Sequence, residues 1–482
     1  MHFRVILRVI GLLVMVFSMS LIPPIVVSLI YNDGELNAFL YGLAANIVGG
    51  FLLWFPVRKE RGELKIRDGF LVTVLFWTVL GFFGSVPFFL SENPELSFTD
   101  ALFESISGLT TTGATILLGI DDLPQSILFY RQMLQWLGGM GIIVLAVAIM
   151  PMLGIGGMQL YRAETPGPVK DTKLTPRIAE TAKALWYIYA TLTIVCALGY
   201  WIAGMTLFDA ICHSFSTVAI GGFSTHDASI GYFDSVAIEL ICTFFMTVSA
   251  FNFALHFFAW RHKSVWHYFK DPEARFFLLM LSSTIILSTL VLAMTSTYDW
   301  GNSIRYAIFE TVTIATTAGF GTSGFADWPH FLPFLLIVTS FVGGCASSTG
   351  GGMKVIRILL ILKQGMREIQ RLIHPNAVIP VKVGGKAIQE RVVSAVWGFF
   401  SAYLLVYIVL MIGLMATGLD QVTSWSAVAA TLNNLGPGLG DVSASFTSIS
   451  DPAKWMLCFS MLLGRLEVFT LLVLFTPMFW QR

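Results

Sequence analysis

The chain has 482 residues, of which 56% are hydrophobic and 12% are charged, and its formal net charge is zero. Soluble domains usually contain about 25% charged residues, so this composition excludes an ordinary soluble globular protein. Apolar stretches of about 20 residues recur along the whole length, as in proteins with several membrane-spanning helices. We therefore predict an all-α polytopic membrane protein, and the zero net charge gives no indication of its partners.

Ten membrane spans are predicted in chain order. The first is longer than the apolar region of a signal peptide and lacks a small-residue cleavage site, so we expect it to be retained as a helix. The predicted spans cover residues 5–30, 37–57, 69–91, 125–150, 184–205, 233–260, 274–296, 331–362, 392–418 and 454–480.

The distribution of basic residues predicts the orientation. Lysine and arginine are concentrated at both ends of the chain and in the alternate segments 57–67, 159–183, 261–275 and 354–391. Basic residues favour cytoplasmic connections, so both termini are predicted to be cytoplasmic. The opposite connections are acidic, which would attract cations, although acidic residues are also simply tolerated on that side.

Four polar segments that are too short to span a membrane lie between pairs of these spans. They read DALFESISGLTTTGAT (100–115), DAICHSFSTVAIGGFS (209–224), YAIFETVTIATTAGFG (306–321) and SAVAATLNNLGPGLG (426–440). They align on Gly113, Gly222, Gly319 and Gly436, with Glu104, His213, Glu310 and Ala427 nine positions earlier. In the fourth segment Gly438 is an alternative matching glycine. The spacing indicates an internal repeat.

The repeat unit is a span, a re-entrant helix, a loop and a second span. Four such units follow two additional spans, which accounts for the ten predicted spans. The resulting division is 1–67 for the two N-terminal spans, 68–158 for the first pore repeat, 159–268 for the second, 269–372 for the third, with a broken second span, and 373–482 for the fourth.

These loops predict a cation site. Non-helical backbone is tolerated within a membrane where it lines a cavity, and rings of backbone carbonyls can replace the water around a cation. Glycine allows such backbone turns, and threonine hydroxyls can bind neighbouring backbone groups. The predicted K⁺-binding residues are Thr111, Thr112, Gly113, Ile220, Gly221, Gly222, Thr317, Ala318, Gly319, Asn434, Leu435 and Gly436. The alternative is a set of glycine-rich turns that bind no ion.

A glycine-rich stretch, GGCASSTGGG (343–352), lies halfway along the predicted span 331–362 and indicates a break in that helix. Close packing of two helices through small residues is the alternative. Arg465 lies about eleven residues into the last span, where an arginine is costly and usually faces a cavity. Its expected partners are the carbonyls near 345–350 or Glu467, and a structural ion pair is the alternative to a role in the ion path. The predicted gate comprises Gly343, Gly344, Cys345, Ala346, Ser347, Ser348, Thr349, Gly350 and Arg465.

Several long motifs resemble those of the TrkH family, the membrane subunits of Trk potassium uptake systems within the superfamily of K⁺ transporters. They are LTTTGAT, SFSTVAIGGFSTHDASIGYFDS, TTAGF, GGCASSTGGGMKVIRILL, TLNNLGPGLG and GRLEVFTLLVLFTP, and the resemblance covers essentially the whole chain. It implies K⁺ passage through a four-fold pseudo-symmetric pore with one filter glycine per repeat. In this family four such glycines are associated with a preference for K⁺ over Na⁺. The resemblance also implies a gate formed by the intramembrane loop, a homodimer in the bacterial inner membrane, and a cytosolic nucleotide-binding partner, TrkA.

We therefore expect a selective, gated pore for potassium uptake, with K⁺ as substrate, Rb⁺ next and Na⁺ more weakly. An ion-coupled secondary K⁺ transporter, driven by H⁺ or Na⁺, is the alternative; such proteins often contain inverted repeats, whereas these repeats run parallel. The chain has no metalloprotease or nucleotide-binding motif, so we expect no enzyme activity and no covalent cofactor. The basic loops 159–183 and 354–391 are expected to dock a TrkA-like regulator, with membrane lipid around the chain and no nucleic-acid partner.

Overall fold

The computed structural model describes residues 1–60, 62, 64–144 and 178–481, and in this part of the chain nearly all regular structure is helical. The N-terminal helices are α1 (Phe3–Ser18), α2 (Ile22–Tyr31) and α3 (Leu36–Trp54). Next come α4 (Ile66–Leu90), α5 (Phe98–Leu109) and α6 (Gln125–Val144), and then α8 (Ile178–Ile202), α9 (Leu207–Ala219), α10 (Val236–Ala250), α11 (Phe253–His262) and α12 (Trp266–Lys270).

The second half contains two more sets of helices and a small hairpin. The first set is α13 (Pro272–Met294), α14 (Trp300–Ala315), α15 (Leu332–Val342) and α16 (Val355–Ile373), followed by the strands β1 (Lys382–Val383) and β2 (Lys386–Ala387). The second set is α17 (Glu390–Ala416), α18 (Gln421–Leu432), α19 (Asp451–Arg465), α20 (Phe469–Leu472) and α21 (Pro477–Trp480). The chain is thus an all-α polytopic membrane protein.

Among the described residues, six helices are long and apolar enough to cross a membrane, or eight if each of two bent pairs forms one span. The other two predicted spans correspond to α6 and to the short apolar helix α15. Part of the span predicted over 125–150 and most of the basic loop 159–183 lie outside the described residues. The boundary between the first two predicted repeats lies there as well.

Two spans predicted as straight helices, 233–260 and 454–480, are bent instead. α10 and α11 meet at 97°, because Asn252 starts a new helix by accepting a hydrogen bond from the backbone N–H of Ala254 at 2.9 Å. α19 and α20 meet at 107°. There Glu467 and Val468 adopt left-handed φ values of 52° and 59°, which a helix cannot accommodate. Arg465 is therefore the last residue of a helix, not the middle of one.

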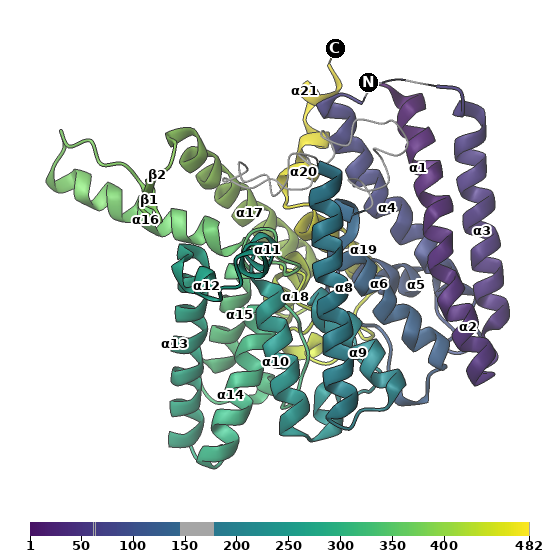
Figure 1. Ribbon diagram of the computed structural model, residues 1–482, viewed down its shortest axis with the longest axis horizontal. Coiled ribbons are helices and arrows are strands. Elements are labelled where there is room, and N and C mark those ends of the chain that lie inside the picture. The colour runs from purple at the N-terminus through teal and green to yellow at the C-terminus, as the bar shows by residue number, and fades with distance from the viewer. Residues whose placement is uncertain (61, 63, 145–177, 482) are drawn as a thin grey trace.

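The predicted break in the span 331–362 is present. α15 ends at Val342, and α16 begins at Val355, so the connection 343–354 is not helical. We call it the intramembrane segment. α16 then extends away from the body of the molecule (Figure 1).

Four short helices, α5, α9, α14 and α18, begin in the same way. In each, a side-chain oxygen of the residue before the helix accepts a hydrogen bond from a backbone N–H of the first turn, which satisfies a donor that has no helical partner. These capping residues are Ser97, Thr206, Asp299 and Asp420. Residues 98–109, 207–219, 300–315 and 421–432 thus form the re-entrant helices that the sequence predicts.

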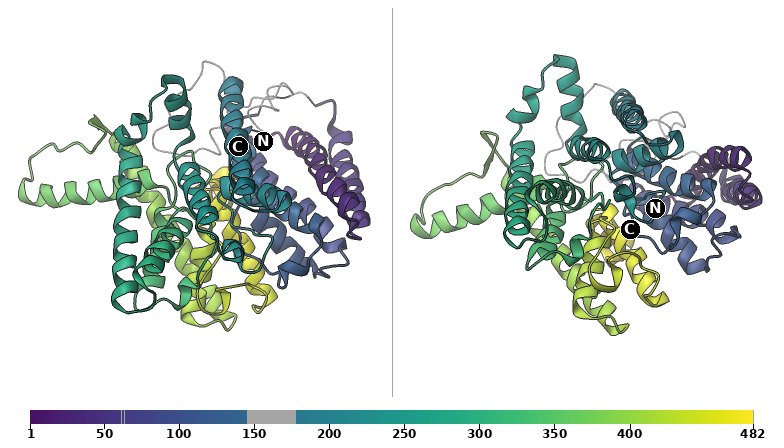
Figure 2. Two further views of the ribbon diagram at one scale, coloured as in Figure 1. Left: turned by 60° about the horizontal axis from the view of Figure 1, so that its bottom comes forward. Right: turned by 90° about the horizontal axis from the view of Figure 1, so that it is seen from below.

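The four units are arranged in chain order around a common centre (Figure 2). Each re-entrant helix packs between the two long helices of its own unit and against the second long helix of the preceding unit: α9 against α6, α14 against α10, α18 against α15, and α5 against α19. The last of these contacts closes the circle. Helices α1 and α3 pack together at the periphery, outside this circle.

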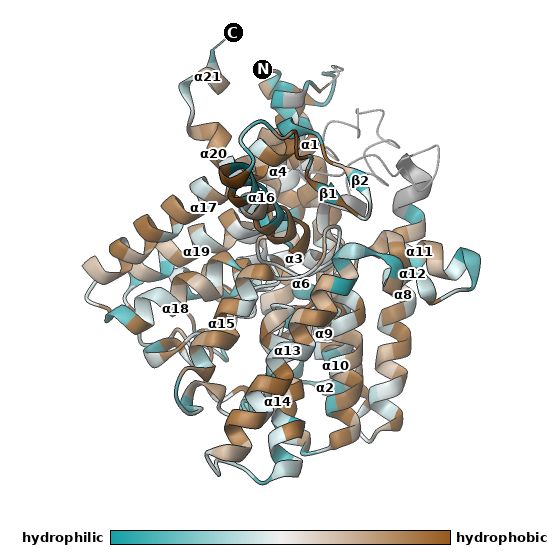
Figure 3. Cartoon of the chain, turned by 90° about the vertical axis from the view of Figure 1, so that its left-hand side faces the viewer, coloured by the Kyte–Doolittle hydropathy of each residue, from teal (hydrophilic) through white to brown (hydrophobic). Residues whose placement is uncertain are grey.

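Both termini lie at the same face of the molecule (Figure 1). The Arg67 side chain donates a hydrogen bond to the carbonyl oxygen of Gln481 at 2.6 Å, and the rings of Phe3 and Trp480 stack 6.5 Å apart. Apolar residues cover much of the helical surface, as a lipid environment requires (Figure 3).

Candidate functional site

The loops that follow the four re-entrant helices share one backbone conformation. In each, the residue two positions before the aligned glycine and the glycine itself have positive φ values. The values are 55° and 80° for Thr111 and Gly113, 55° and 80° for Ile220 and Gly222, 69° and 80° for Thr317 and Gly319, and 54° and 103° for Asn434 and Gly436. Gly438 does not share this conformation, so Gly436 is the glycine in register with the other three.

The same loops share a backbone hydrogen bond. The N–H of the residue before each glycine donates to the carbonyl five residues earlier, which ties the loop to the end of its own helix. The pairs are Thr112 to Ser107 (2.9 Å), Gly221 to Ser216 (2.8 Å), Ala318 to Thr313 (2.8 Å) and Leu435 to Ala430 (2.7 Å). All four helices therefore direct their partly negative C-terminal ends toward the loops, which favours a cation there.

The four loops form a closed ring. A Cβ added to Gly113 would lie 2.1 Å from the carbonyl oxygen of Gly221, so no side chain fits between these two loops. A Cβ added to Gly222 would lie 2.0 Å from the carbonyl oxygen of Ala318, and one added to Gly319 would lie 2.1 Å from that of Leu435. A Cβ added to Gly436 would lie 2.8 Å from the carbonyl oxygen of Thr112. Each loop thus abuts the next, and the fourth returns to the first. We call residues 111–113, 220–222, 317–319 and 434–436 the glycine ring.

The position nine residues before each glycine braces the loop that follows. Glu104 accepts hydrogen bonds from the Thr115 hydroxyl at 3.0 Å and the Ile116 N–H at 3.1 Å. Its counterpart in the third unit, Glu310, accepts from the N–H groups of Thr322 at 2.8 Å and Ser323 at 3.0 Å.

The second and fourth units achieve the same bracing with other residues. The Nε2 atom of His213 and the hydroxyl of Ser224 are 2.9 Å apart. Ala427 has no polar group, and the residue before it, Ser426, accepts from the N–H of Leu439 at 2.8 Å. The aligned position, to which the sequence assigned no role, therefore braces the loop in three units. In the fourth unit Ser426, one residue earlier, takes this role and was not singled out from the sequence.

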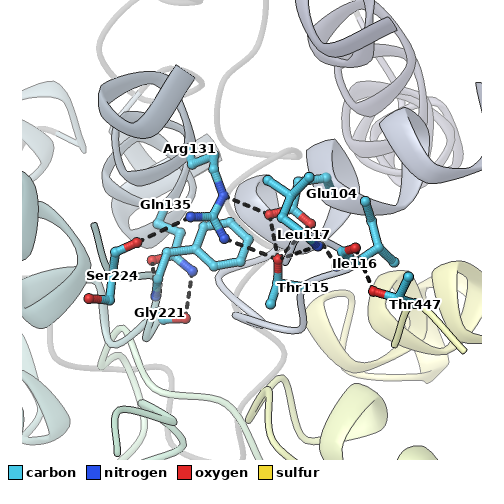
Figure 4. Close-up of polar contacts among 10 residues, drawn as sticks. Glu104, Thr115, Ile116, Leu117, Arg131, Gln135, Gly221, Ser224 and Thr447 are labelled. Carbon is cyan, nitrogen blue, oxygen red and sulfur yellow. Dashed lines mark hydrogen bonds and ion pairs between the residues drawn. The ribbon is translucent and has the colours of Figure 1, made fainter. Parts of the chain in front are cut away.

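Two further polar residues were not singled out as site residues from the sequence. Arg131 and Gln135 lie one turn apart on α6; Arg131 connects the first two loops, and Gln135 binds the second (Figure 4). Arg131, which is buried, donates to Glu104 at 2.7 Å and to the Ser224 carbonyl at 3.1 Å. Gln135 donates to the Gly221 carbonyl at 2.5 Å and accepts from the Phe223 N–H at 3.1 Å. The signal for them was a pair of polar residues, i and i+4, in an apolar span.

The intramembrane segment lies directly against the ends of three re-entrant helices. The Thr349 hydroxyl donates to the carbonyl of Val218 at 3.0 Å. The N–H of Gly351 donates to the Thr317 hydroxyl at 2.7 Å, and that of Gly352 to the carbonyl of Asn433 at 3.0 Å. The segment is therefore held beside the glycine ring.

Arg465 joins this segment to the ring. Its guanidinium donates to the Thr349 carbonyl at 3.4 Å, to the Thr111 hydroxyl at 3.3 Å and to the carbonyls of Gly138 and Gly139. Thr349 belongs to the predicted group of carbonyl partners. Glu467, the other predicted partner, forms an ion pair with Arg357.

A polar cluster joins the loops of the first two units on the far side of the ring. His226 lies 2.5 Å from a carboxylate oxygen of Asp121 and 3.5 Å from one of Asp209, and its ring stacks on Tyr232 at 3.5 Å between centroids. Burial alone would lower the pKa of His226, but hydrogen bonds and charges from Asp209 and Asp121 raise the pKa above its ordinary value of 6.5.

Comparison with known proteins decides the family. The family model of TrkH, described as a cation transport protein, matches residues 35–482. The chain belongs to the TrkH family. It is similar to the Trk system potassium uptake protein TrkH of Halomonas elongata, at 62% identity, and to that of Escherichia coli K12, at 60%; both matches cover all of each chain. The crystal structure of the potassium transporter TrkH from Vibrio parahaemolyticus matches with a TM-score of 0.91 and 58% identity, also over all of both chains.

Membership of the TrkH family makes the chain a cation transport protein and not an enzyme. A more divergent relative, the Trk system potassium uptake protein TrkG of Escherichia coli K12, is 42% identical over the full chain and 99% of its own length. The fold expected from the family resemblance is confirmed by the match to the solved structure.

Proposed function

We propose that the chain takes up K⁺ across a membrane through the glycine ring. The observation that carries this proposal is the closure of the ring: four loops of one backbone conformation abut one another in chain order around a centre. Rings of backbone oxygens can replace the hydration shell of a cation, and four helix ends add negative potential at the same place. The relatives named as potassium uptake proteins support K⁺ as the cation.

The proposed K⁺ site comprises the twelve predicted residues of the ring. They are Thr111, Thr112, Gly113, Ile220, Gly221, Gly222, Thr317, Ala318, Gly319, Asn434, Leu435 and Gly436. The ring buries all of them except the glycines Gly113, Gly222 and Gly319, which are partly exposed. We expect Rb⁺ to follow K⁺ and Na⁺ to be carried more weakly.

Substitution of Gly113 by serine tests this function. A Cβ there clashes with the Gly221 carbonyl and strains a backbone with φ of 80°, so the ring must deform. We expect the preference for K⁺ over Na⁺ to fall about tenfold or more, with membrane insertion intact. Uptake of K⁺ and Na⁺ by cells that lack other K⁺ uptake systems measures the preference.

The matched control is Gly321→Ser, because Gly321 follows the ring in the third unit and a Cβ there meets nothing within 4 Å. This variant should transport like the wild type. Unchanged uptake constants for K⁺ and Na⁺ in Gly113→Ser would refute the ring as the selective site.

We further propose that the intramembrane segment and Arg465 form a gate beside the ring. Support comes from the hydrogen bonds of the segment to Thr317, Asn433 and Val218 and from the contacts of Arg465 with both parts. An arginine in a narrow, poorly hydrated passage repels cations. The residues proposed for the gate are Gly343, Gly344, Cys345, Ala346, Ser347, Ser348, Thr349, Gly350 and Arg465.

The cellular setting proposed for the chain is a homodimer in the bacterial inner membrane with both termini in the cytoplasm. The common position of the termini and the basic connections support this orientation. Exposed apolar side chains along α16, such as Leu362, Met366 and Ile369, suit a contact with a second copy. A cytosolic TrkA-like nucleotide-binding subunit is the proposed regulator.

A further inference from the structure

An apolar cavity lies between helices α8, α10, α11, α12 and α13, where the second and third units meet. Its volume is about 770 Å³, within the range of roughly 300–1,000 Å³ that is typical of ligand pockets. It is lined by Ala184, Tyr187, Ile188, Thr191, Leu192, Phe244, Val248, Phe251, His256, Phe257, Trp260, Val265, Tyr268, Phe269 and Leu278. The lining is overwhelmingly hydrophobic and rich in aromatic side chains.

The most buried polar side chain in the wall of this cavity, His256, already has a partner at each ring nitrogen. The Nδ1 atom of His256 lies 2.6 Å from the hydroxyl of Tyr268, and its Nε2 atom lies 3.0 Å from the carbonyl oxygen of Val248. Water needs two to four polar partners to occupy a cavity, and neither ring nitrogen of His256 is free to supply one. The cavity therefore suits an apolar occupant.

The mouth of the cavity opens toward the membrane. Tyr187 on α8 and Phe244 on α10 belong to helices that cross the membrane, yet their side chains are 63% and 60% exposed. The solvent at such a surface is lipid. Trp260 on α11, which is 77% exposed, lies at the end of a helix bent by 97° from α10. Exposed tryptophan is characteristic of the boundary between lipid tails and headgroups.

Basic residues follow this tryptophan directly. Arg261 and Lys263 are exposed at the end of α11, and Lys270 is exposed at the end of α12. The acid in this stretch, Asp271, caps α13 by accepting from the Ala274 N–H at 2.8 Å. Hydrophilic residues accordingly gather around α11 and α12 (Figure 3). The uncompensated charge at the mouth is positive, which attracts anionic lipid headgroups.

We propose that this cavity binds one acyl chain of an anionic phospholipid, whose headgroup is held by Arg261 and Lys263. The tail fills the apolar space, and the phosphate meets the positive charges of Arg261 and Lys263, which follow Trp260 at the end of α11. The bend at Phe251 and Asn252 makes both contacts possible, because it places α11 across the end of the cavity.

The back of this cavity touches the intramembrane segment. The carbonyl of Ala250 accepts a hydrogen bond from the Cys345 N–H at 2.8 Å, and the N–H of Phe253 donates to the Ser347 carbonyl at 3.1 Å. Both bonds flank Phe251, which lines the cavity. The lipid is thus separated from the proposed gate by a single turn of backbone. Lipid binding can be measured without transport, so the lipid site holds or fails independently of the proposed function.

Native mass spectrometry tests the headgroup. Protein in a non-ionic detergent is mixed with phosphatidylglycerol or with phosphatidylcholine of the same acyl chains. The wild type should retain one phosphatidylglycerol per chain about tenfold more tightly than phosphatidylcholine. Arg261→Gln combined with Lys263→Gln should remove this preference. Both residues are exposed, so the double variant should remain folded and monodisperse, which size-exclusion chromatography verifies.

The control is Arg58→Gln with Lys59→Gln, an exposed basic pair after α3 and far from the cavity along the chain. This variant should keep the preference. Equal retention of the two lipids by the wild type overturns the proposal, and so does an unchanged preference in the Arg261 and Lys263 variant.

Tryptophan fluorescence tests the tail. One equivalent of phosphatidylglycerol with brominated acyl chains should quench the wild type, and Trp260→Phe should lose part of that quenching. Trp201→Phe is the matched control, because Trp201 is also exposed, on α8, but does not line the cavity. Equal quenching in the wild type and both variants overturns the proposal. Absence of quenching in the dimer also overturns the proposal, because a second copy of the chain would then occupy the cavity.

Discussion

At the scale of residues, Glu104 and Arg131 form an ion pair inside the protein. Both are fully buried, and together they join the loops of the first and second units. Removing one member of a buried ion pair leaves the other charge without a partner and typically costs about 3–5 kcal/mol. We expect Glu104→Gln to lower the thermal stability of the purified protein clearly and to reduce K⁺ uptake, as measured by a melting curve in detergent and by uptake in cells.

The exposed pair Arg4 and Glu60, at 3.0 Å, provides the comparison. Glu60→Gln should change stability by at most about 1 kcal/mol, because exposed ion pairs are screened by solvent. In addition, the double variant Glu104→Gln with Arg131→Gln should lose less than the sum of the two single variants. Additive losses would show that the two side chains act separately.

His226 makes the stability of the folded chain depend on pH. Its pKa in the folded protein is raised by Asp209 and Asp121, against the effect of burial, so the charged histidine stabilises the cluster. This stabilisation is complete below the ordinary pKa of 6.5 and is lost as the pH rises through the raised value. We therefore expect the melting temperature to fall as the pH rises above about 6.5, and His226→Gln to flatten this fall.

Asp121 affects the stability of the same cluster at low pH. Burial opposes ionisation, but hydrogen bonds from His226 and Asp227 lower the pKa of Asp121 below 3.8, so its contribution is lost only in strong acid. His374→Gln, a substitution at an exposed site after α16, is the control and should leave the pH profile of stability unchanged. A profile that His226→Gln does not alter would contradict this assignment.

At the level of elements, the intramembrane segment is held by bonds to other parts of the chain and not by helical bonds of its own. Arg465→Ala removes the hydrogen bonds from this arginine to the Thr111 hydroxyl and to the Thr349 carbonyl of the segment. Deletion of Ser347 to Gly350 removes the hydrogen bond from the segment to the carbonyl of Val218. Both changes should raise K⁺ flux several-fold without the regulator, because one barrier to the cation is removed. Flux into liposomes, on monodisperse protein, measures this.

The opposite result would also be informative. If Arg465 is purely structural, its loss leaves carbonyl groups unpaired, and both expression and flux should fall. Arg58→Ala, at an exposed site after α3, controls for the removal of a positive charge. Wild-type or reduced flux in both gate variants would rule out the gate.

Sequence patterns predicted the elements well where polar residues recur in register. The four glycines and the glycine-rich break located the ring loops and the intramembrane segment, because no side chain or regular helix fits there. The two bends were not predicted. Asn252 and the pair Arg465 and Glu467 are few polar residues within long apolar stretches, and nothing in their spacing indicates a change of helix direction. Arg131 and Gln135 were missed because their importance depends on partners from the second unit, which one sequence does not reveal. Ser426 was missed because it lies one residue from the aligned position.

At the scale of the whole molecule, the proposed regulator must dock on the face that carries the termini and basic loops. Arg367 belongs to the basic segment 354–391, which is expected to dock the regulator, but two contacts of 2.7 Å already hold its side chain to Glu390. A reversal of its charge would therefore test folding and not docking. Arg371 and Lys382 are exposed. We expect Arg371→Glu with Lys382→Glu to weaken co-purification with the soluble subunit about tenfold while leaving the protein monodisperse.

Reversal of Lys59 to Glu, at an exposed site after α3, controls for the change of net charge. It should leave co-purification intact. If the complex also survives the reversal of both Arg371 and Lys382, the regulator docks on another surface.

The closed ring also bears on how the protein is made. The Asn434 side chain donates to the Thr112 hydroxyl at 2.9 Å, and Gly436 abuts the Thr112 carbonyl, although 322 residues separate Thr112 from Asn434. During synthesis the first loop therefore enters the membrane long before its neighbour from the fourth unit exists. Until α18 is in place, the first loop has a neighbour on one side only. The glycine ring is consequently among the last parts of the protein to be completed, and a nascent chain that stops before residue 421 holds three of its four loops but cannot close it.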